Sequence, residues 1–318
     1  TASREFLLPN AFNAKHTKML KDAVNIPVFI GHNIFSPEDA EKMLAEGNAD
    51  FVALGRSQLA EPAWAKKAKE GRASDIKPCI NCLIGCIDRG MLSHTPIHCT
   101  VNPSLYRFEC KPVEKAETRK QVAVVGAGPA GCEAALTASK RGHQVTIYEK
   151  RCIGGAMIEA SKPENKANIK RLIHYYEDHI MHDPNITLVK EEVEYETLVH
   201  SGYDAVIIAV GGKTRILNVP GIEKNSVIYA SDYLNGSTAV TGNTVVVIGG
   251  GINGAETALE LNAEGKKVTI VEMTDAFLAN FSSACQAYLA TINETDIKIL
   301  TGKRLTAVHE NNVILTDR

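Results

Sequence analysis

Four cysteines lie close together in the first third of the chain, in the spacing Cys-x2-Cys-x3-Cys-x12-Cys. They are Cys79, Cys82, Cys86 and Cys99. Four thiolates can bind either zinc or an iron–sulfur cluster. Structural zinc sites more often use two separated Cys-x2-Cys pairs, whereas here three thiolates come from one short loop and the fourth from a distance. We therefore favour an iron–sulfur cluster over zinc, and zinc over four buried free thiols.

The other four of the eight cysteines are scattered along the chain. Cys110 follows Cys99 by 11 residues and is a reserve candidate for the fourth ligand. We expect Cys132, Cys152 and Cys285 to be small buried side chains. A secreted disulfide framework would spread paired cysteines through a small domain, usually behind a signal peptide, and no such signal pattern is present. We therefore expect a reducing, cytoplasmic location.

A glycine-rich turn, GAGPAG, follows the apolar run QVAVV and precedes a helical pattern. Gly126 would permit the tight turn, Gly128 would let the backbone approach a pyrophosphate, and Gly131 would allow close packing of helix and strand. Glu149 ends the next strand, 23 residues after Gly126, where a carboxylate can accept hydrogen bonds from a ribose. The helix N-terminus would offer N–H groups to the phosphates. The pattern predicts a dinucleotide site, with a tight turn that binds nothing as the alternative.

The same unit recurs about 120 residues later, which makes it an internal repeat. Its turn, GGGING, contains Gly249, Gly251 and Gly254, and Glu272 ends the following strand. An acid there favours the free 2′-hydroxyl of NAD(H) and repels the 2′-phosphate of NADP(H). The alternative is a second FAD-type or vestigial turn. For Glu256, early in the helix, we expect only a favourable charge near the helix N-terminus.

Residues 1–73 have an alternating pattern of helices and short apolar strands. Strands are expected at 26–30 and 51–54, and helices at 14–24, 37–46 and 62–70, with Ser36 as an N-cap and Pro37 in the first helical position. This order predicts parallel strands, yet two strands cannot form a barrel of eight. We expect the segment to need partners that this chain lacks. Residues 74–118 show little periodicity and are expected to be an irregular loop with an organising ligand.

Composition excludes several classes of protein. The chain has 35 basic and 37 acidic residues and a net charge of −2, so no strong field is available to recruit nucleic acid or an anionic membrane. We find no apolar run long enough to span a bilayer. A small-molecule substrate is the expected partner, and the sequence is compatible with a homo-oligomer.

The string CINCLIGC…HCTVNP, followed by VAVVGAGPAG, resembles the old-yellow-enzyme-like NADH:flavin oxidoreductases. This family includes 2,4-dienoyl-CoA reductase, 2-enoate reductase, trimethylamine dehydrogenase and the bile-acid oxidoreductases. The string IPVFIGHNI…ADFVALGRSQLAEP resembles the last two β/α units of their FMN barrel. The resemblance implies an α/β fold: a C-terminal remnant of a (β/α)8 barrel at 1–73, a cluster segment at 74–118, the first part of an FAD-binding domain at 119–240, and an incomplete NAD-binding domain at 241–318.

The resemblance also implies which residues bind each cofactor. The four clustered cysteines would bind a [4Fe-4S] cluster. FAD would lie against Gly126, Gly128, Gly131, Glu149, Gly154, Gly155, Gly211 and Gly212. NADH would lie against Gly249, Gly251, Gly254 and Glu272, and the FMN phosphate would lie against Gly55 and Arg56. One departure concerns Gly31-His32-Asn33, where the family usually has Gly-Arg, so an arginine contact to the phosphate is missing there. No catalytic residue is assigned, because the family's catalytic acid is expected upstream of Thr1.

The implied function is electron transfer from NADH through FAD and the cluster to FMN and an activated C=C bond. Two alternatives remain open: an electron-transfer module that feeds a partner protein, and an amine dehydrogenase that sends electrons outward. Glu272 and the intact second turn argue against the latter. Six barrel strands and the C-terminal return of the FAD fold are missing. We therefore expect a fragment or truncated form that cannot reduce an enoate by itself.

Overall fold

The computed structural model describes residues 7, 11–105, 113–280 and 282–318. It divides into two compact units. The larger unit contains the described residues of 9–81 and 95–212, and the smaller unit contains those of 1–8, 82–94 and 213–318. The predicted cysteine segment, 74–118, is therefore shared between the two units. In the described part of the chain, no helix is both long and apolar enough to cross a membrane.

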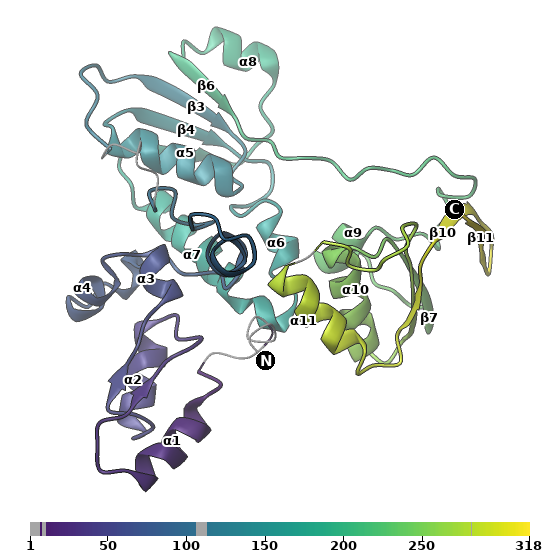
Figure 1. The fold of residues 1–318 in the computed structure, drawn as a ribbon. Coiled ribbons are helices and arrows are strands. Elements are labelled where there is room, and N and C mark those ends of the chain that lie inside the picture. Colours follow the sequence, from purple (N-terminus) through teal and green to yellow (C-terminus); the bar gives the residue numbers. More distant parts are fainter. Residues whose placement is uncertain (1–6, 8–10, 106–112, 281) are drawn as a thin grey trace. The chain divides into compact units, whose positions relative to one another are not determined.

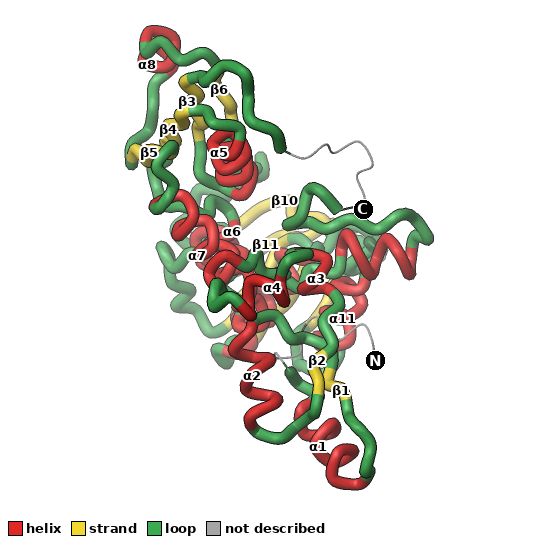
Figure 2. The backbone as a smooth tube through the Cα atoms, turned by 90° about the vertical axis from the view of Figure 1, so that its left-hand side faces the viewer, coloured by secondary structure: helices red, strands yellow, loops and turns green. Residues whose placement is uncertain are grey.

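The larger unit begins with alternating helices and short strands, as predicted (Figure 2). They are α1 (Ala14–Ala23), β1 (Phe29–Ile30), α2 (Pro37–Ala45), β2 (Phe51–Val52), α3 (Arg56–Ala60) and α4 (Trp64–Lys69). The two strands pair in parallel, with Phe29 opposite Phe51. Ser36 caps α2, because its side chain accepts a hydrogen bond from the Asp39 amide at 3.1 Å, and Pro37 takes the first helical position.

The two sides of this small sheet differ in exposure. Ile30 is fully buried in a core that also contains Met43 and Trp64. The Phe29 and Phe51 rings stack with centroids 4.8 Å apart, yet 62% and 50% of these residues remain exposed. The pair forms an apolar surface of the kind that the two-strand pattern predicts.

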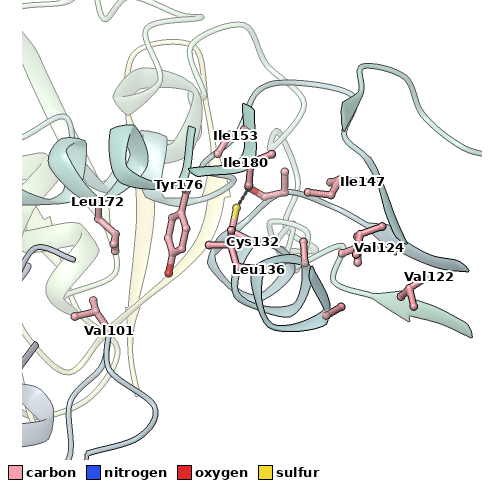
Figure 3. Packing of buried hydrophobic residues seen from close by; sticks show 14 of the residues in the cluster. Val101, Val122, Val124, Cys132, Leu136, Ile147, Ile153, Leu172, Tyr176 and Ile180 are labelled. Carbon is pink, nitrogen blue, oxygen red and sulfur yellow. Dashed lines mark hydrogen bonds between the residues drawn. The ribbon is translucent and has the colours of Figure 1, made fainter. Parts of the chain in front are cut away.

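The larger unit continues with a four-stranded parallel sheet in the order β5-β4-β3-β6. Its elements are β3 (Gln121–Val125), α5 (Pro129–Lys140), β4 (Gln144–Tyr148), α6 (Met157–Ala160), α7 (Ala167–Met181), β5 (Ile186–Val189), α8 (Tyr195–His200) and β6 (Ala205–Ile208). Helix α5 lies along β3 and β4 (Figure 1). Figure 3 shows the buried core between the sheet and the helices, with Val124 and Ile147 from the strands, Cys132 from α5 and Tyr176 from α7.

The smaller unit repeats this plan with a three-stranded parallel sheet in the order β7-β8-β9. Its elements are a π-helix (Ile84–Leu92), α9 (Ala230–Leu234), β7 (Thr244–Ile248), α10 (Ile252–Ala263), β8 (Lys267–Val271), α11 (Ser283–Ile292), β9 (Lys298–Leu300), β10 (Lys303–Val308) and β11 (Val313–Asp317). The last two strands form an antiparallel hairpin with a register shift between Leu305 and Ala307.

The cysteine segment has more regular structure than predicted. Besides a 3-10 turn at Ala73–Asp75, it contains the π-helix, which follows Leu83 in a left-handed conformation (φ 61°). Leu83 is buried in the core of the smaller unit, and Ile87 packs against the same core. The segment thus folds on a core distant in sequence, and its wide helical turn does not produce the 3.6-residue periodicity on which the prediction relied.

Candidate cofactor sites

The first glycine turn, between β3 and α5, is closed so tightly that two of its positions require glycine. Gly126 has φ +99°, and a Cβ added there would lie 2.4 Å from the carbonyl oxygen of Ala209. A Cβ added at Gly131 would lie 1.9 Å from the carbonyl oxygen of Gly126. Helix α5 can therefore approach the strand only because Gly131 has no side chain, as the motif predicts, and the backbone after β6 can pass the turn only because Gly126 has none.

Three other predicted residues gather at this turn. Glu149 accepts hydrogen bonds from the backbone N–H groups of Ala127, at 2.8 Å, and Arg151, at 2.7 Å. The N–H of Gly154 donates to the carbonyl oxygen of Ala127 at 2.8 Å. A Cβ added at Gly155 would lie 2.9 Å from the Cα of Gly128. The turn thus has an acid at one side and a second glycine loop packed against it.

The run after β6 also reaches the first turn. Ala209 and Val210 contact the space beside Gly126. Gly211 has φ +70°, and a Cβ added at Gly211 or Gly212 would meet no described atom within 4 Å. The contacts beside Gly126 are thus made by Ala209 and Val210, and the role of Gly211 and Gly212 stays a prediction.

The second glycine turn, between β7 and α10, repeats the essential contacts of the first. Gly249 has φ +108°, and a Cβ added at Gly254 would lie 1.9 Å from the carbonyl oxygen of Gly249. Glu272 accepts hydrogen bonds from the amide of Gly250 at 2.7 Å, and from the amide and hydroxyl of Thr274 at 2.7 and 2.8 Å. Gly251, the N-cap of α10, follows directly.

These contacts keep the second acid ionised. Burial acts to raise the pKa of Glu272, but hydrogen bonds from Thr274 and Gly250 outweigh it, so the pKa lies below its ordinary value of 4.5. An ionised carboxylate has several lone pairs and accepts hydrogen bonds only. Glu272 is therefore suited to hold the two hydroxyls of a ribose.

An acid in each following helix has a tyrosine partner that the sequence did not reveal. We expected Glu256 to act only on the helix dipole, but it is 4% exposed, and the hydroxyl of Tyr288 in α11 donates to it at 2.6 Å. Glu133 occupies the same place in α5 and accepts from the hydroxyl of Tyr176 in α7 at 3.0 Å. Each acid lies seven residues after the first glycine of its turn, and this shared spacing was the signal available in the sequence.

The four clustered cysteines are divided between the two units. Cys79 and Cys99 belong to the larger unit, where Cys79 is buried and Cys99 packs against the same core. Cys82 and Cys86 belong to the smaller unit. Among the described residues, no group of three or more His, Cys, Asp or Glu side chains is placed to hold a metal ion. Four thiols at this spacing nevertheless have the chemistry of an iron–sulfur ligand set. Cys110 lies outside the described residues.

The remaining cysteines fit the prediction in two of three cases. Cys132 and Cys285 are buried, as expected. Cys152 is exposed, so the prediction for this residue was wrong. It lies beyond the end of β4, in the loop that turns toward Gly154, where the sheet no longer provides a core to cover it.

The predicted FMN-phosphate residues lie at the N-terminus of α3. Gly55 is exposed and precedes the helix. The guanidinium of Arg56 donates to the side-chain oxygen of Asn33 at 2.7 Å and to that of Asn81, and it lies 5.6 Å from the centroid of the Phe35 ring. Both asparagines are buried and have positive φ. Arg56 is thus held in place by Asn33, which lies in the loop where the family usually has an arginine, and by Asn81, which the sequence did not indicate.

Comparisons with known proteins agree with this architecture. Residues 120–318 match the pyridine nucleotide-disulphide oxidoreductase family, and residues 7–75 match the NADH:flavin oxidoreductase / NADH oxidase family. The chain is 44% identical to an NADH oxidase of Thermoanaerobacter brockii over 80% of its own length and 40% of that protein. It is 34% identical to a bilirubin reductase of Mediterraneibacter gnavus over 96% of its own length and 48% of that protein.

The fold is similar to that of a solved 2-naphthoyl-CoA reductase in complex with 2-naphthoyl-CoA, with a TM-score of 0.90 and 28% identity. That match covers 98% of this chain and 48% of the reductase. The chain thus spans about half the length of the relatives that it matches. Its α/β fold combines a pyridine dinucleotide-binding domain with part of an FMN-type barrel domain. The chain belongs to the old-yellow-enzyme-like flavin oxidoreductases, in which an NADH:flavin oxidoreductase module is joined to a pyridine nucleotide-disulphide oxidoreductase module.

Proposed function

We propose that this chain carries the electron-handling part of an oxidoreductase that passes electrons from NADH through FAD and a [4Fe-4S] cluster to FMN and an activated C=C bond. Residues 1–73 would belong to the FMN barrel, 74–118 to the cluster segment, 119–240 to the FAD domain and 241–318 to the NAD domain. The observation that carries the proposal is the repeated turn, in which a terminal acid bonds the amide of the second turn residue in both units.

Each group of residues has a separate task in this proposal. The glycines of the two turns let a pyrophosphate approach the helix N-termini, where N–H groups are available. Glu149 and Glu272 would exchange a backbone partner for ribose hydroxyls. Arg56, already oriented by Asn33 and Asn81, would hold the FMN phosphate beside Gly55. The four clustered cysteines would supply the thiolates of the cluster.

The related proteins favour this direction of electron flow. Two of those compared above are named as reductases, of bilirubin and of 2-naphthoyl-CoA. The intact second turn with Glu272 provides a place for the nicotinamide donor that such a reductase needs. The alternatives are an electron-transfer module that serves a partner protein and an amine dehydrogenase that uses the reverse direction.

The proposal can be tested on anaerobically purified protein reconstituted with iron and sulfide. We expect iron, acid-labile sulfide and FAD, and NADH-dependent reduction of an artificial dye. Zinc without iron would contradict the cluster. Dye reduction driven by an amine but not by NADH would favour the amine dehydrogenase alternative.

Nucleotide preference provides the second arm of the test. NADPH should be used about 10- to 100-fold less efficiently than NADH, the range expected when a charged hydrogen bond of about 1.5–3 kcal/mol is lost. Glu272→Gln should reduce that preference, whereas Glu149→Gln, the matched change at the first turn, should leave it intact and lower FAD content. Equal use of both nucleotides by the wild-type protein would refute the assignment of Glu272.

A further inference from the structure

An ion pair from Lys77 connects the cysteine loop of the larger unit to α5, beside the apolar contacts of Cys79 with the same core. The ammonium of Lys77 forms an ion pair with Glu133, the α5 acid described above. The pair is largely removed from water, since the side chains of Lys77 and Glu133 are 13% and 30% exposed. Tyr176 donates to the same carboxylate oxygen at 3.0 Å, so Glu133 receives hydrogen bonds from two separate parts of the unit.

Two aromatic rings enclose the ammonium. The Nζ of Lys77 lies 5.5 Å from the centroid of the Tyr175 ring and 5.8 Å from that of Tyr176. Both distances are within the range of a cation–π interaction. Burial, followed by the charge of Glu133, raises the pKa of both tyrosines, so their hydroxyls stay protonated at neutral pH. Lys77 is therefore held at a fixed position rather than on a freely moving stem.

Lys77 directly precedes Pro78 and Cys79, so its position restricts the cysteine that follows. The restricted φ of proline limits the freedom between the two side chains. Cys79 is buried in the same core as Tyr176, and its sulfur accepts a hydrogen bond from the Asn81 amide at 3.4 Å. Asn81 in turn accepts a hydrogen bond from Arg56. The loop 77–81 is thus attached to α5 at one end and to the FMN-phosphate arginine at the other.

Helix α5 connects this loop to the first glycine turn. The helix begins after Gly128, and Cys132, next to Glu133, donates through its sulfur to the carbonyl oxygen of Ala127 at 3.2 Å (Figure 3). A displacement of Glu133 would therefore change the position of the glycine turn, and a displacement of Lys77 would change the position of Cys79.

We propose that Lys77 is a positioning residue that holds Cys79 in its ligand geometry by attaching the cysteine loop to the FAD-type helix through Glu133. The inference rests on the proposed function, because it gives Cys79 the role of a cluster ligand. Removal of the ammonium would leave Glu133 and the tyrosine rings without their cation and would free the loop. Residues that orient metal ligands in this way typically change metal affinity or activity by about 10- to 100-fold when mutated.

The first experiment measures cluster stability in the reconstituted protein. Lys77→Met should lose its iron–sulfur absorbance in air about tenfold faster than the wild type or more, whereas Lys77→Arg, which keeps the charge, should restore most of the lifetime. The matched control is Lys150→Met, which removes an exposed ion pair with Glu192 at 2.7 Å in the same unit and should change nothing. Glu133→Gln combined with Lys77→Met should be little worse than either change alone, because paired residues are not additive.

The second experiment needs no cluster. In the metal-free protein, iodoacetamide labelling of Cys79, followed by mass spectrometry, should be faster in Lys77→Met than in the wild type and unchanged in Lys150→Met. Equal labelling and equal cluster lifetimes in wild type and Lys77→Met would overturn the inference, even if the melting temperature fell. If the wild type takes up no iron and sulfide but Lys77→Met exposes Cys79, the proposed cluster fails while the attachment by Lys77 stands.

Discussion

The two glycine turns contain the same motif but have different surroundings. In both, a Cβ on the third glycine would lie 1.9 Å from the carbonyl oxygen of the first. Around the first turn, Ala209 closes on Gly126 and Gly155 approaches Gly128. Around the second, a Cβ added at Gly249 or Gly251 would meet no described atom within 4 Å. The motif therefore determines the contact of helix with strand. The rest of the fold determines whether the other glycines of the turn tolerate a side chain.

The difference has a topological cause. The first sheet has a fourth strand, β6, on the far side of β3, and the backbone after β6 passes over the turn. In the described part of the second sheet, β7 pairs only with β8, so no comparable backbone lies over Gly249. Equal motifs thus predict equal local geometry but unequal sensitivity to mutation.

The largest effects are expected where the turns are alike. Gly131→Ala and Gly254→Ala each place a methyl group against a backbone oxygen that cannot move without opening the turn. Each should cost about 3 kcal/mol of unfolding free energy, the upper part of the range for overpacking. The first should also abolish FAD retention and the second NADH binding, as measured by flavin content and by nucleotide titration. Gly242→Ala, whose Cβ would have only an ordinary contact at 3.8 Å, is the control. Normal stability and cofactor binding in either turn variant would refute this geometry.

The two turns should differ in how much stability they lose when their first glycine is replaced by alanine. Both positions have positive φ, so alanine should cost about 1–3 kcal/mol of strain at either one. Only Gly126→Ala adds a collision, with the Ala209 carbonyl 2.4 Å away. Its urea midpoint should therefore fall further than that of Gly249→Ala, by an amount equivalent to about 1–3 kcal/mol. Equal shifts would mean that the backbone after β6 does not restrict the first turn.

Substitution at the second residue of the turn should affect the second site alone. Gly250 corresponds to Ala127 of the first turn, and a Cβ there would lie 2.8 Å from the Cβ of Glu272 and 2.9 Å from the Phe277 ring. Gly250→Ala should displace Glu272 and raise the KM for NADH about tenfold, equivalent to about 1.4 kcal/mol, while FAD content stays unchanged. An unchanged KM would show that Glu272 moves aside without loss.

Sequence reasoning found the parts of the molecule that depend on local chemistry. Both strand–turn–helix units, their terminal acids, and the Ser36 cap of α2 follow from short-range rules of backbone conformation and hydrogen bonding. The parallel pairing of β1 with β2 follows from the predicted alternation of helices and strands. These features need no knowledge of distant residues.

The parts that it missed depend on long-range contacts. The pairing of Arg56 with Asn81 joins residues 25 apart, that of Lys77 with Glu133 joins residues 56 apart, and neither pair has a local pattern. The burial of Glu256 required the position of α11. Cys152 is exposed because it lies beyond the end of β4, and the residue type alone does not reveal that position. Single-sequence patterns carry no information on such pairs, because charged and amide residues are common on solvated surfaces.

The smallest expected effect concerns the one thiol that distinguishes the two helices. Cys132 donates to the carbonyl oxygen of Ala127, and its counterpart in α10 is Ala255, which cannot. Cys132→Ala makes the first helix resemble the second and should lower the free energy of unfolding by about 1 kcal/mol, since the lost sulfur hydrogen bond is weak and the cavity small.

Burial, followed by the charges of Glu133 and Glu149, raises the pKa of the Cys132 thiol from 9.0 to about 12. Because the folded pKa is the higher one, the thiol's contribution to stability is complete below pH 9 and declines as the pH rises toward 12. Denaturant midpoints of wild type and Cys132→Ala should therefore converge as the pH rises above 9 and then change order toward pH 12, because a difference of about three pKa units corresponds to about 4 kcal/mol. A constant difference between the two midpoints from pH 7 to 11 would show that the thiol does not titrate as a buried group. It would also show that the neutral thiol does not stabilise the first helix.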